Sequence, residues 1–465
     1  MTFLTISPGD VLGLTSEEAA ILQDLLDIYQ THQTKNEEKQ RYYEGKISLD
    51  SVNLGIALPK GLQNLEIGCA WGAKCVDVLA ARSMFDGFVA QDGTDVPEIQ
   101  QLVRDNNLLS EYMKATKDEL KFGCSFATLA KDERIGCKIR FHSPMTAAAR
   151  WDGNRGRIAY GLAIINVAPL EEKPEVIMPS TVYLYLSDVM IVLRRAGDSL
   201  WISEHYPHKM GRPLMEPMVW SSTSAKPLGR SRIKEPIRRM IDGYVRTMAN
   251  ASIGLEFSTA PQKYILGVTD EQFDKISADK FHQYVGSVLA ATTNPETGEK
   301  PTFGQLTQGN ISPHVEMLRV YATQFSAATG LPVTDTGVVN DANPTSSDAI
   351  IAQTKTLVSM AEELNTGNGN ALRTIALMAL AVSRESTLEE LTDEDKSIMA
   401  HFRNPAMPSV SVTADAAIKI ANAREGFAAT DTFLEMIGFD QADIRRIRAQ
   451  EQLARGRTTL AELEI

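Results

Sequence analysis

The sequence is poor in cysteine and has no long apolar run. Its four cysteines show neither a CxxC pair nor dense spacing: Cys69, Cys75, Cys124 and Cys137. This pattern predicts reduced thiols rather than a disulfide framework or a zinc site. No segment approaches the ~18 uncharged apolar residues of a membrane-spanning helix. The N-terminus lacks a basic region followed by an apolar run. We therefore expect no metal site, no secretory signal and no contact with a membrane.

The motifs of two large enzyme classes are also missing. No GxxxxGK[ST] loop occurs, which argues against an ATP-driven motor. No GxSxG segment or recognisable triad spacing occurs either, so a serine-hydrolase site is not predicted. The sequence thus predicts a protein that is not an enzyme and needs no cofactor.

Basic residues are in short supply. The chain carries 47 Lys and Arg against 59 Asp and Glu, a net charge of −12. Non-specific affinity for DNA comes from neutralising phosphates, so this balance argues against a protein that grips DNA tightly. It remains compatible with a channel through which DNA slides, because acidic walls do not bind the duplex.

The patterning of apolar residues predicts an α+β fold in which helices precede a sheet. Hydrophobic residues make up 43% of the chain, enough for a real core. From about residue 138 to 205 the apolar period changes from helical to two, which indicates a mostly antiparallel meander. The predicted helices span residues 16–45, 62–83, 96–120, 230–256, 270–290, 312–330 and 343–384.

Several shorter elements are predicted in the second half of the chain. A short strand is predicted at 264–268 and a loop or hairpin at 292–309, while 331–343 reads as a loop. The segment NTGNGN at 365–370 has such poor helix propensity that we expect a kink or a break in the last long helix. Three short helices are predicted in the tail, the last beginning at Asp440.

One segment suggests an enzyme. LEIGCAWG at 65–72 resembles the first motif of S-adenosylmethionine-dependent methyltransferases, with Asp92 at the separation of the residue that holds the ribose. The middle glycine is replaced by Ala70, and residues 59–64 supply no buried strand. The required alternation of strands and helices does not follow. A methyltransferase built on residues 65–92 is therefore the alternative, not the preferred interpretation.

The main basic feature is the run 230–246. Three of its arginines are spaced by seven and fall on nearly the same face of the predicted helix: Arg232, Arg239 and Arg246. Glu235 and Asp242 are close enough to pair with them. The face is either solvated, or forms ion pairs with a neighbouring subunit, or contacts phosphates in a channel. A ring of subunits would multiply each charge into a circle.

Several segments together resemble the portal proteins of long-tailed, siphovirus-type bacteriophages. Each segment alone is weak, but their joint order is specific. They are RYYEGKISL (41–49), VDVLAARSMFDGF (76–88), PLGRSRI (227–233), FSTAPQKYILG (257–267), ATGLPVTDTGV (328–338), NPTSSDAI (343–350) and HFRNP…PSVSVTADAAIKIA (401–421). The resemblance implies a portal fold with an α/β wing, a two-helix stem, a small α/β clip, a long kinked helix and a helical crown.

The resemblance also implies how the chain divides. The expected regions are the wing (1–225), the first stem helix (226–256), the clip (257–311), the second stem helix (312–330), the tunnel loop (331–345), the kinked helix with the return to the wing (346–410) and the crown (411–465).

The function implied is that of a head–tail connector at one capsid vertex, through which double-stranded DNA is packaged and ejected. The subunit would form a closed homo-oligomeric ring, of twelve copies in the virion, after assembly in the host cytoplasm. Its other partners would be the large terminase, a head–tail adaptor, and the major capsid and scaffolding proteins. Another capsid structural protein is the remaining alternative.

The implied constriction around DNA is the tunnel loop. Its expected residues are Thr336, Val338, Val339, Asn340, Asp341 and Asn343. The loop contains Asp335 and Asp341 but no Lys or Arg, which departs from a charge-based grip. We therefore expect a low-friction collar, with sparse basic rings from Arg232, Arg239 and Arg246 on the stem, and ATP hydrolysis left to the terminase.

Overall fold

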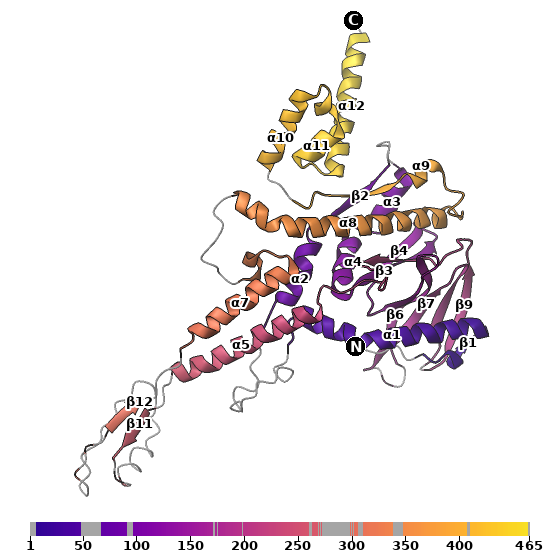
Figure 1. Cartoon of the computed structure of the whole chain (residues 1–465). Coiled ribbons are helices and arrows are strands. Elements are labelled where there is room, and N and C mark those ends of the chain that lie inside the picture. The colour runs from indigo at the N-terminus through magenta and orange to yellow at the C-terminus, as the bar shows by residue number, and fades with distance from the viewer. Residues whose placement is uncertain are drawn as a thin grey trace. The chain divides into compact units, whose positions relative to one another are not determined.

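The chain divides into two compact units, each described here by itself (Figure 1). Unit 1 combines Met1–Tyr43, Ala73–Lys234 and Pro344–Ile465, and unit 2 combines Glu44–Gly72 and Glu235–Asn343. The computed structural model describes residues 6–47, 67–90, 96–170, 173, 175–197, 199–259, 263–267, 269, 271, 298, 300, 302–305, 310–337, 347–406 and 410–463.

A six-stranded sheet forms one layer of unit 1, in the order β1-β9-β8-β7-β6-β5. Neighbouring strands are antiparallel except β1, which runs parallel to β9. The predicted antiparallel meander is thus confirmed from residue 147 to 207, whereas its predicted beginning at 138–142 belongs to a second sheet. The strands are β1 (Val11–Leu12), β5 (Ala147–Asp152), β6 (Arg157–Pro169), β7 (Ile177–Tyr185), β8 (Val189–Arg195) and β9 (Trp201–Pro207).

Helix α1 (Ser16–Tyr43) covers one face of this sheet and confirms the first predicted helix. A short 3₁₀ turn, η1 (Pro8–Asp10), precedes it. Leu22, Leu25 and Leu26 recur at helical spacing and are buried against the strands. The phenol of Tyr29 donates to the carbonyl of Met145 at 2.9 Å, which fixes the helix on the loop before β5.

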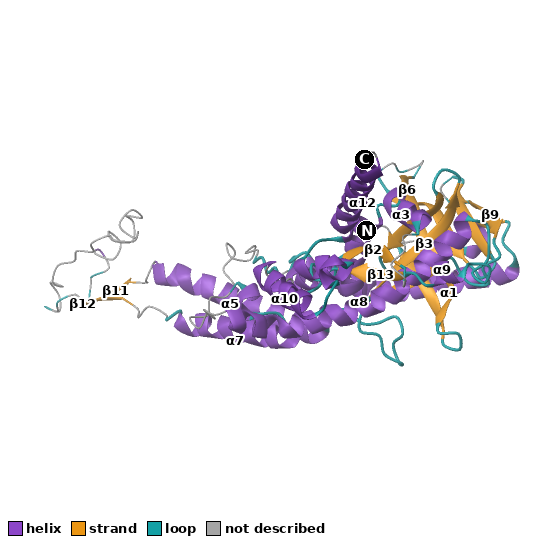
Figure 2. Ribbon diagram, turned by 90° about the horizontal axis from the view of Figure 1, so that it is seen from above, coloured by secondary structure: helices purple, strands orange, loops and turns teal. Residues whose placement is uncertain are grey.

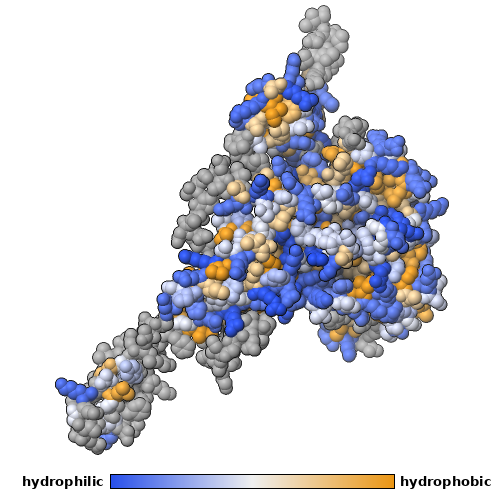
Figure 3. Space-filling view, viewed as in Figure 1, coloured by the Kyte–Doolittle hydropathy of each residue, from blue (hydrophilic) through white to orange (hydrophobic). Residues whose placement is uncertain are grey.

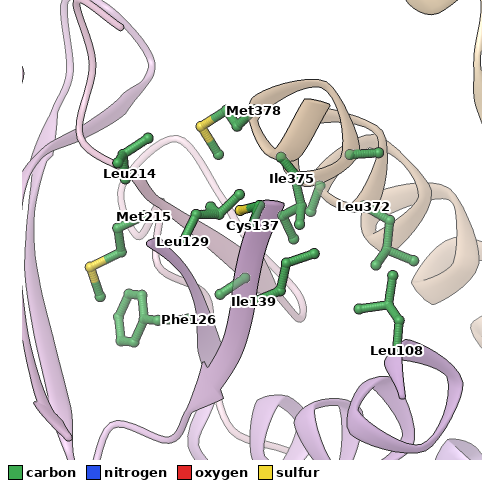
Figure 4. Close-up of a cluster of buried hydrophobic side chains, with 14 of the residues drawn as sticks. Leu108, Phe126, Leu129, Cys137, Ile139, Leu214, Met215, Leu372, Ile375 and Met378 are labelled. Carbon is green, nitrogen blue, oxygen red and sulfur yellow. The ribbon is translucent and has the colours of Figure 1, made fainter. Parts of the chain in front are cut away.

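A second, three-stranded sheet with order β10-β3-β4 lies in the other core of unit 1. Its strands are β3 (Cys124–Asp132), β4 (Gly136–His142) and β10 (Met215–Val219), preceded by α3 (Pro97–Asp105) and α4 (Leu108–Phe122). Figure 4 shows Ile139 of these strands on the side of Leu372 and Ile375 of the long helix α8 (Ser347–Ser383), whereas Phe126 lies on the side of Met215. The single helix predicted at 96–120 is found as two helices, α3 and α4, which are separated at Asn106 and Asn107.

Helix α8 (Ser347–Ser383) runs without interruption through residues 365–370. The sequence predicted either a kink or a break at this segment, and the predicted break is wrong. The reason is tertiary, because Asn368 is fully buried and its side-chain amide donates to Tyr112 and Glu119 of α4. Packing and hydrogen bonding thus override a weak local propensity.

A two-stranded sheet joins distant parts of unit 1. Strand β2 (Phe85–Val89), which follows α2 (Trp71–Ala80), pairs antiparallel with β13 (Met399–Phe402). The predicted helix at 62–83 is shorter than expected, since residues 67–69 are not helical and 62–66 lie outside the described residues. Helix α9 (Asp393–Lys396) precedes β13 and is capped by Thr392.

Three helices follow in the tail, as predicted. They are α10 (Val410–Ala423), α11 (Asp431–Ile437) and α12 (Gln441–Leu463), with a 3₁₀ turn η6 (Phe427–Ala429) between the first two. The last helix begins one residue after the predicted start and, at 23 residues, is not short.

Unit 2 is built on two long helices, α5 (Glu235–Thr259) and α7 (Ser312–Thr329), with the hairpin strands β11 (Lys263–Leu266) and β12 (Thr302–Gln305) between them in the chain. Gly330 ends α7 with a positive φ of 70°, as predicted for a helix C-cap. A 3₁₀ turn, η5 (Val333–Thr336), follows. The helix predicted at 270–290 lies almost wholly outside the described residues.

Candidate nucleic-acid interface

Helices α5 and α7 lie side by side in unit 2 (Figures 1 and 2). Ile237, Ile241 and Val245 repeat every four residues along α5 and are at most 3% exposed. Ala322 and Phe325 of α7 are fully buried. Apolar residues at this spacing form one stripe of a helix, so burial of the two stripes holds the pair together.

A glycine brings the two helices close. A Cβ atom at Gly243 would lie 2.5 Å from the ring of Tyr321, which is inside van der Waals contact. Gly243 is therefore needed for close packing rather than for a special backbone conformation, and the helix tolerates its low propensity for that reason.

Some apolar side chains of α7 are exposed. Val315, Met317 and Val320 are 45%, 42% and 46% exposed, and Figure 3 shows apolar residues over α7 among hydrophilic ones. Met317 and Val320 are three residues apart and lie on one side of the helix, whereas Val315 points away from Met317. Met317 and Val320 thus form a small exposed apolar pair on α7.

Trp71 anchors the base of the helix pair. Its ring centroid lies 4.3 Å from that of Tyr244 on α5 and 4.8 Å from that of Phe325 on α7. Its indole Nε1 donates to the carbonyl oxygen of Thr336 at 3.0 Å. One side chain therefore joins both helices and η5. Sequence reasoning missed this role, because Trp71 lies inside the methyltransferase-like motif at 65–72.

Arg239 and Arg246 lie on α5 as predicted, seven residues apart and exposed. The Arg239 guanidinium donates to Glu235 one turn earlier, at 2.7 Å, and its side chain is 76% exposed. This pairing was predicted from the spacing, and an exposed i,i+4 ion pair contributes little to stability. Arg239 and Arg246 thus lie on an exposed part of α5.

The placement of Arg232 on that face is wrong. Arg232 precedes α5, is only 8% exposed, and belongs to unit 1. Its Nε donates to the carbonyl of Cys75 at 2.6 Å, and its guanidinium lies 5.7 Å from the ring centre of Trp220. Burial lowers the pKa of the guanidinium from its ordinary value. Arg232 is therefore a packing residue.

Arg232 is not part of α5 because backbone and side-chain hydrogen bonds hold the segment before the helix. The amide of Arg232 donates to the carbonyl of Leu120, and the hydroxyl of Ser231 donates to the carbonyl of Lys121. These bonds to the end of α4 hold the segment in a non-helical conformation. Helix α5 then starts at Glu235, with Pro236 in its first turn, where a proline is favoured. The predicted start at Arg230 was five residues too early.

The predicted tunnel loop is described only in its first part. Thr336 is 7% exposed, and its hydroxyl donates to the carbonyl of Val333. The expectation that its side chain faces a channel is corrected, because that side chain is buried within unit 2. The remaining expected residues lie outside the described residues: Val338, Val339, Asn340, Asp341 and Asn343.

The β11–β12 hairpin carries apolar side chains at its surface. Tyr264, Leu266 and Phe303 are 44%, 61% and 45% exposed. Tyr264 lies opposite Gly304, where an added Cβ would be 2.3 Å from the tyrosine ring, so the ring covers the glycine. A two-stranded ribbon is marginal by itself, and exposed apolar residues on it favour docking to other surfaces.

The alternative of a methyltransferase finds no support in the geometry. Residues 67–69 are not a strand, and 71–80 form a helix. Within the part of the chain that the structure describes, β2 pairs only with β13, and that pairing is antiparallel. A dinucleotide-type site needs a parallel sheet with the glycine turn at a strand end.

The described residues contain no group of three or more His, Cys, Asp or Glu able to hold a metal ion. None of the described helices has the length and apolarity to cross a bilayer. The four cysteines are buried and free, and burial raises the pKa of each thiol, to about 11 for Cys69 and to about 12 for the others.

Solved structures offer similar folds at low identity. A chain from the virion of a native gene transfer agent (GTA) particle is 12% identical with a TM-score of 0.46, and the match covers 79% of this chain and 89% of that one. A chain from the neck of an empty GTA particle, computed with C6 symmetry, gives a TM-score of 0.47 at the same identity.

Two curated relatives and a family model match this sequence over most of its length. The portal protein of Mycobacterium phage D29 is 23% identical over 456 residues, covering 95% of this chain and 90% of the relative. That of Mycobacterium phage L5 is 22% identical over 423 residues, covering 88% and 83%. The model for the phage portal protein family of the SPP1 Gp6-like type matches residues 22–456. This chain therefore belongs to the phage portal protein family, the connectors between phage head and tail.

Proposed function

We propose that this portal subunit assembles with copies of itself into a closed ring whose central channel passes double-stranded DNA during packaging and ejection. The observation that carries the proposal is the family match across residues 22–456, which includes both units. The helix pair of unit 2 supports it, because that pair exposes Met317 and Val320 on one side of α7 and Arg239 and Arg246 on α5.

The parts of the chain take the roles expected of a portal in this proposal. Helices α5 and α7 form the stem, the β11–β12 hairpin belongs to the clip, and residues 331–345 form the constriction. Residues up to 225, with α8, form the wing, and the tail helices α10–α12 form the crown. The exposed apolar residues of the hairpin suit the clip, since the clip would dock the terminase first and the head–tail adaptor afterwards.

Contact with DNA would be weak and non-specific. The net charge of −12 keeps the duplex from adhering, because each neutralised phosphate would add affinity. Arg239 and Arg246 would form sparse rings of positive charge in the assembled stem. With Thr336 buried, any contact in the constriction falls to the later loop residues: Val338, Val339, Asn340, Asp341 and Asn343.

The chain would act in a capsid. Virion membership follows from the family, and we propose that the ring forms in the host cytoplasm, on contact with the major capsid and scaffolding proteins. No described group of residues supports catalysis, so ATP hydrolysis is assigned to a separate terminase.

The ring is tested by microscopy. Negative-stain images and native mass spectrometry of the purified protein should show a closed ring with a central hole. A chain that stays monomeric at high concentration, and also in the presence of capsid and scaffolding proteins, would contradict the proposal.

We expect Arg239→Glu to reduce DNA packaging strongly while the subunit stays folded. The pair with Glu235 is exposed to solvent, so losing it should change the unfolding midpoint little. In a ring, by contrast, the substitution reverses a whole circle of charge. In-vitro packaging and ring yield are the two measurements. Loss of rings would assign the arginine to a neighbouring subunit, and loss of packaging by intact rings would assign it to phosphate.

A matched control is Arg134→Glu, on an exposed turn between β3 and β4 in unit 1. It makes the same charge change outside the stem. Arg212 is unsuitable for this purpose, because its side chain is largely buried and paired with Glu216. Equal behaviour of Arg239→Glu and Arg134→Glu would remove any special role for the basic face.

A further inference from the structure

Two polar side chains meet in the interior of unit 1, away from solvent. Glu119 on α4 and Asn368 on α8 are both 0% exposed, and the amide nitrogen Nδ2 of Asn368 donates to Oε2 of Glu119 at 2.8 Å. The second oxygen of each side chain is buried as well, and none of the described residues gives a hydrogen bond to Oε1 of Glu119 or to Oδ1 of Asn368. Buried polar atoms are nearly always paired, so two such oxygens on one bonded pair need a physical reason.

The hydrogen bonds beside this pair run in one direction. Ser83, in the turn before β2, has a single hydroxyl hydrogen and donates it to Oδ1 of Asn365 at 2.6 Å. The 2.6 Å contact between Ser83 and Tyr112 must then use the hydrogen of the Tyr112 hydroxyl. The oxygen of that hydroxyl accepts from Nδ2 of Asn368 at 3.1 Å. Both hydrogens of Nδ2 are thus in use, one on Tyr112 and one on Glu119.

While Glu119 is a carboxylate, no hydrogen of Ser83, Tyr112 or Asn368 is left for the two unpaired oxygens. A buried charge and two buried acceptors without donors are both costly. A proton on Oε1 of Glu119 removes both costs, because a neutral carboxyl has one O–H donor and Oδ1 of Asn368 can accept it. The carboxyl and the carboxamide then match as two flat groups, each of which gives one hydrogen bond and accepts one.

The surroundings of Glu119 favour the neutral form. Burial raises the pKa of its carboxyl to about 8, and the amide hydrogen bond that it accepts acts in the opposite direction. Among the described residues, the titratable groups whose pKa responds to Glu119 are the Tyr112 hydroxyl on α4 and the Cys124 thiol on β3. Burial raises the pKa of both to about 12, so neither is charged near neutrality. Lys39 of α1, which acts on Cys124, donates to the carbonyl of Phe122 at 3.1 Å.

We propose that Glu119 is a neutral acid in the native protein and forms an acid–amide pair with Asn368, which locks α8 onto α4. The O–H of Oε1 donates to Oδ1, while Nδ2 donates to Oε2. The lock lies in the middle of α8, at the segment NTGNGN, whose two glycines give the helix little stability of its own. Ionisation of Glu119 would turn Oε1 into an acceptor facing another acceptor and would loosen the lock. The lock lies within one subunit and acts whether or not the subunits form a ring.

Infrared spectroscopy of the full-length, assembled protein tests for the proton. At about pH 6, the difference between the wild type and Glu119→Gln should show the carbonyl stretch of one neutral carboxylic acid, since the subtraction cancels the other carboxyl groups. Raising the pH to about 10, well above the pKa of about 8, should replace this band with that of a carboxylate. A carboxylate band already present at about pH 6 would overturn the proposal.

Hydrogen exchange of the same samples tests the lock. After correction for the intrinsic rate, the amides of residues 365–370 should exchange at least about tenfold faster at about pH 7.5 than at about pH 5.5, because opening releases the proton that the closed lock holds. Glu119→Gln should abolish this effect, since its amide gives and accepts the same two hydrogen bonds without titrating. Strands β6 and β7 are the reference. A pH effect that persists in Glu119→Gln, or that is equally large in the reference strands, would show that this pair does not lock α8.

A substitution at Asn368 tests the other half of the pair. Asn368→Asp replaces the amide donor with a second carboxyl, so the unfolding midpoint should fall at about pH 7 and recover in acid, where both carboxyls keep their protons. Asn370→Asp makes the same chemical change at an exposed position of the same helix and is the matched control. An Asn368→Asp variant as stable as Asn370→Asp at about pH 7 would contradict the acid–amide pair.

Discussion

Replacing Trp71 with alanine is expected to destabilise unit 2 by about 3–5 kcal/mol, as for a fully packed aromatic residue cut back to a methyl group. The indole is 4% exposed and touches rings on both long helices. The substitution would also leave the carbonyl of Thr336 without its donor. Both losses act on the same three elements, α5, α7 and η5.

Chemical unfolding followed by hydrogen exchange measures this effect. Faster exchange should be confined to α5, α7 and η5, while the six-stranded sheet of unit 1 stays protected. Trp71→Phe is the matched variant, because it retains a ring and removes the Nε1 donor, and it should lose clearly less stability than the alanine variant. An alanine variant with wild-type unfolding and exchange would show that Trp71 does not hold the helix pair.

Glu119→Gln is expected to stabilise the protein at high pH and to flatten its pH dependence. Glu119 is fully buried on α4, and burial raises the pKa of its carboxyl to about 8. At neutral pH the native state therefore keeps a proton that the unfolded chain, with its ordinary carboxyl, has released.

The sign of the effect follows from this difference. Between about pH 4.5 and about pH 8 the native state binds more protons, so the free energy of unfolding falls as pH rises and levels off above pH 8. Each tenfold change in proton affinity corresponds to about 1.4 kcal/mol, so the free energy of unfolding falls by at most about 5 kcal/mol over this range. Glutamine does not titrate and can still accept from Asn368, which now donates to Glu119 at 2.8 Å.

Urea unfolding at a series of pH values provides the measurement. The wild type and Glu119→Gln should be similar near pH 5 and should diverge as pH rises, with the variant more stable. Glu111→Gln, on the exposed side of the same helix and paired with Lys114, serves as the control and should follow the wild type. Parallel curves for the wild type and Glu119→Gln would mean that Glu119 does not titrate in this range.

The buried polar chain around Glu119 explains a segment that sequence patterns misjudged. Asn368 donates to the phenol oxygen of Tyr112, which lies 2.6 Å from the hydroxyl of Ser83. That hydroxyl donates to Asn365 at 2.6 Å. Asn365 and Asn368 of NTGNGN are thus partners of the turn before β2 and of α4, respectively. Propensity alone predicts a weak helix there, and only the packed neighbours reveal why it is intact.

Local patterns in the sequence were enough to predict several elements. Helix α1, the antiparallel meander, the C-cap at Gly330 and the three tail helices follow from periodicity and from residues with restricted backbone preferences. The order of weak motifs along the chain also indicated the family, which the family model over residues 22–456 shows. The signals for the elements lie in residues close together in the chain, where local sterics and amphipathic spacing act.

The roles of single side chains, by contrast, depend on the folded chain. Arg232, Arg239 and Arg246 have the same spacing in the sequence, yet Arg232 is buried beside Cys75 while the other two are exposed on α5. Trp71 and Glu119 owe their importance to partners more than a hundred residues away. Burial and long-range hydrogen bonds depend on which segments the fold brings together, and no local pattern encodes that.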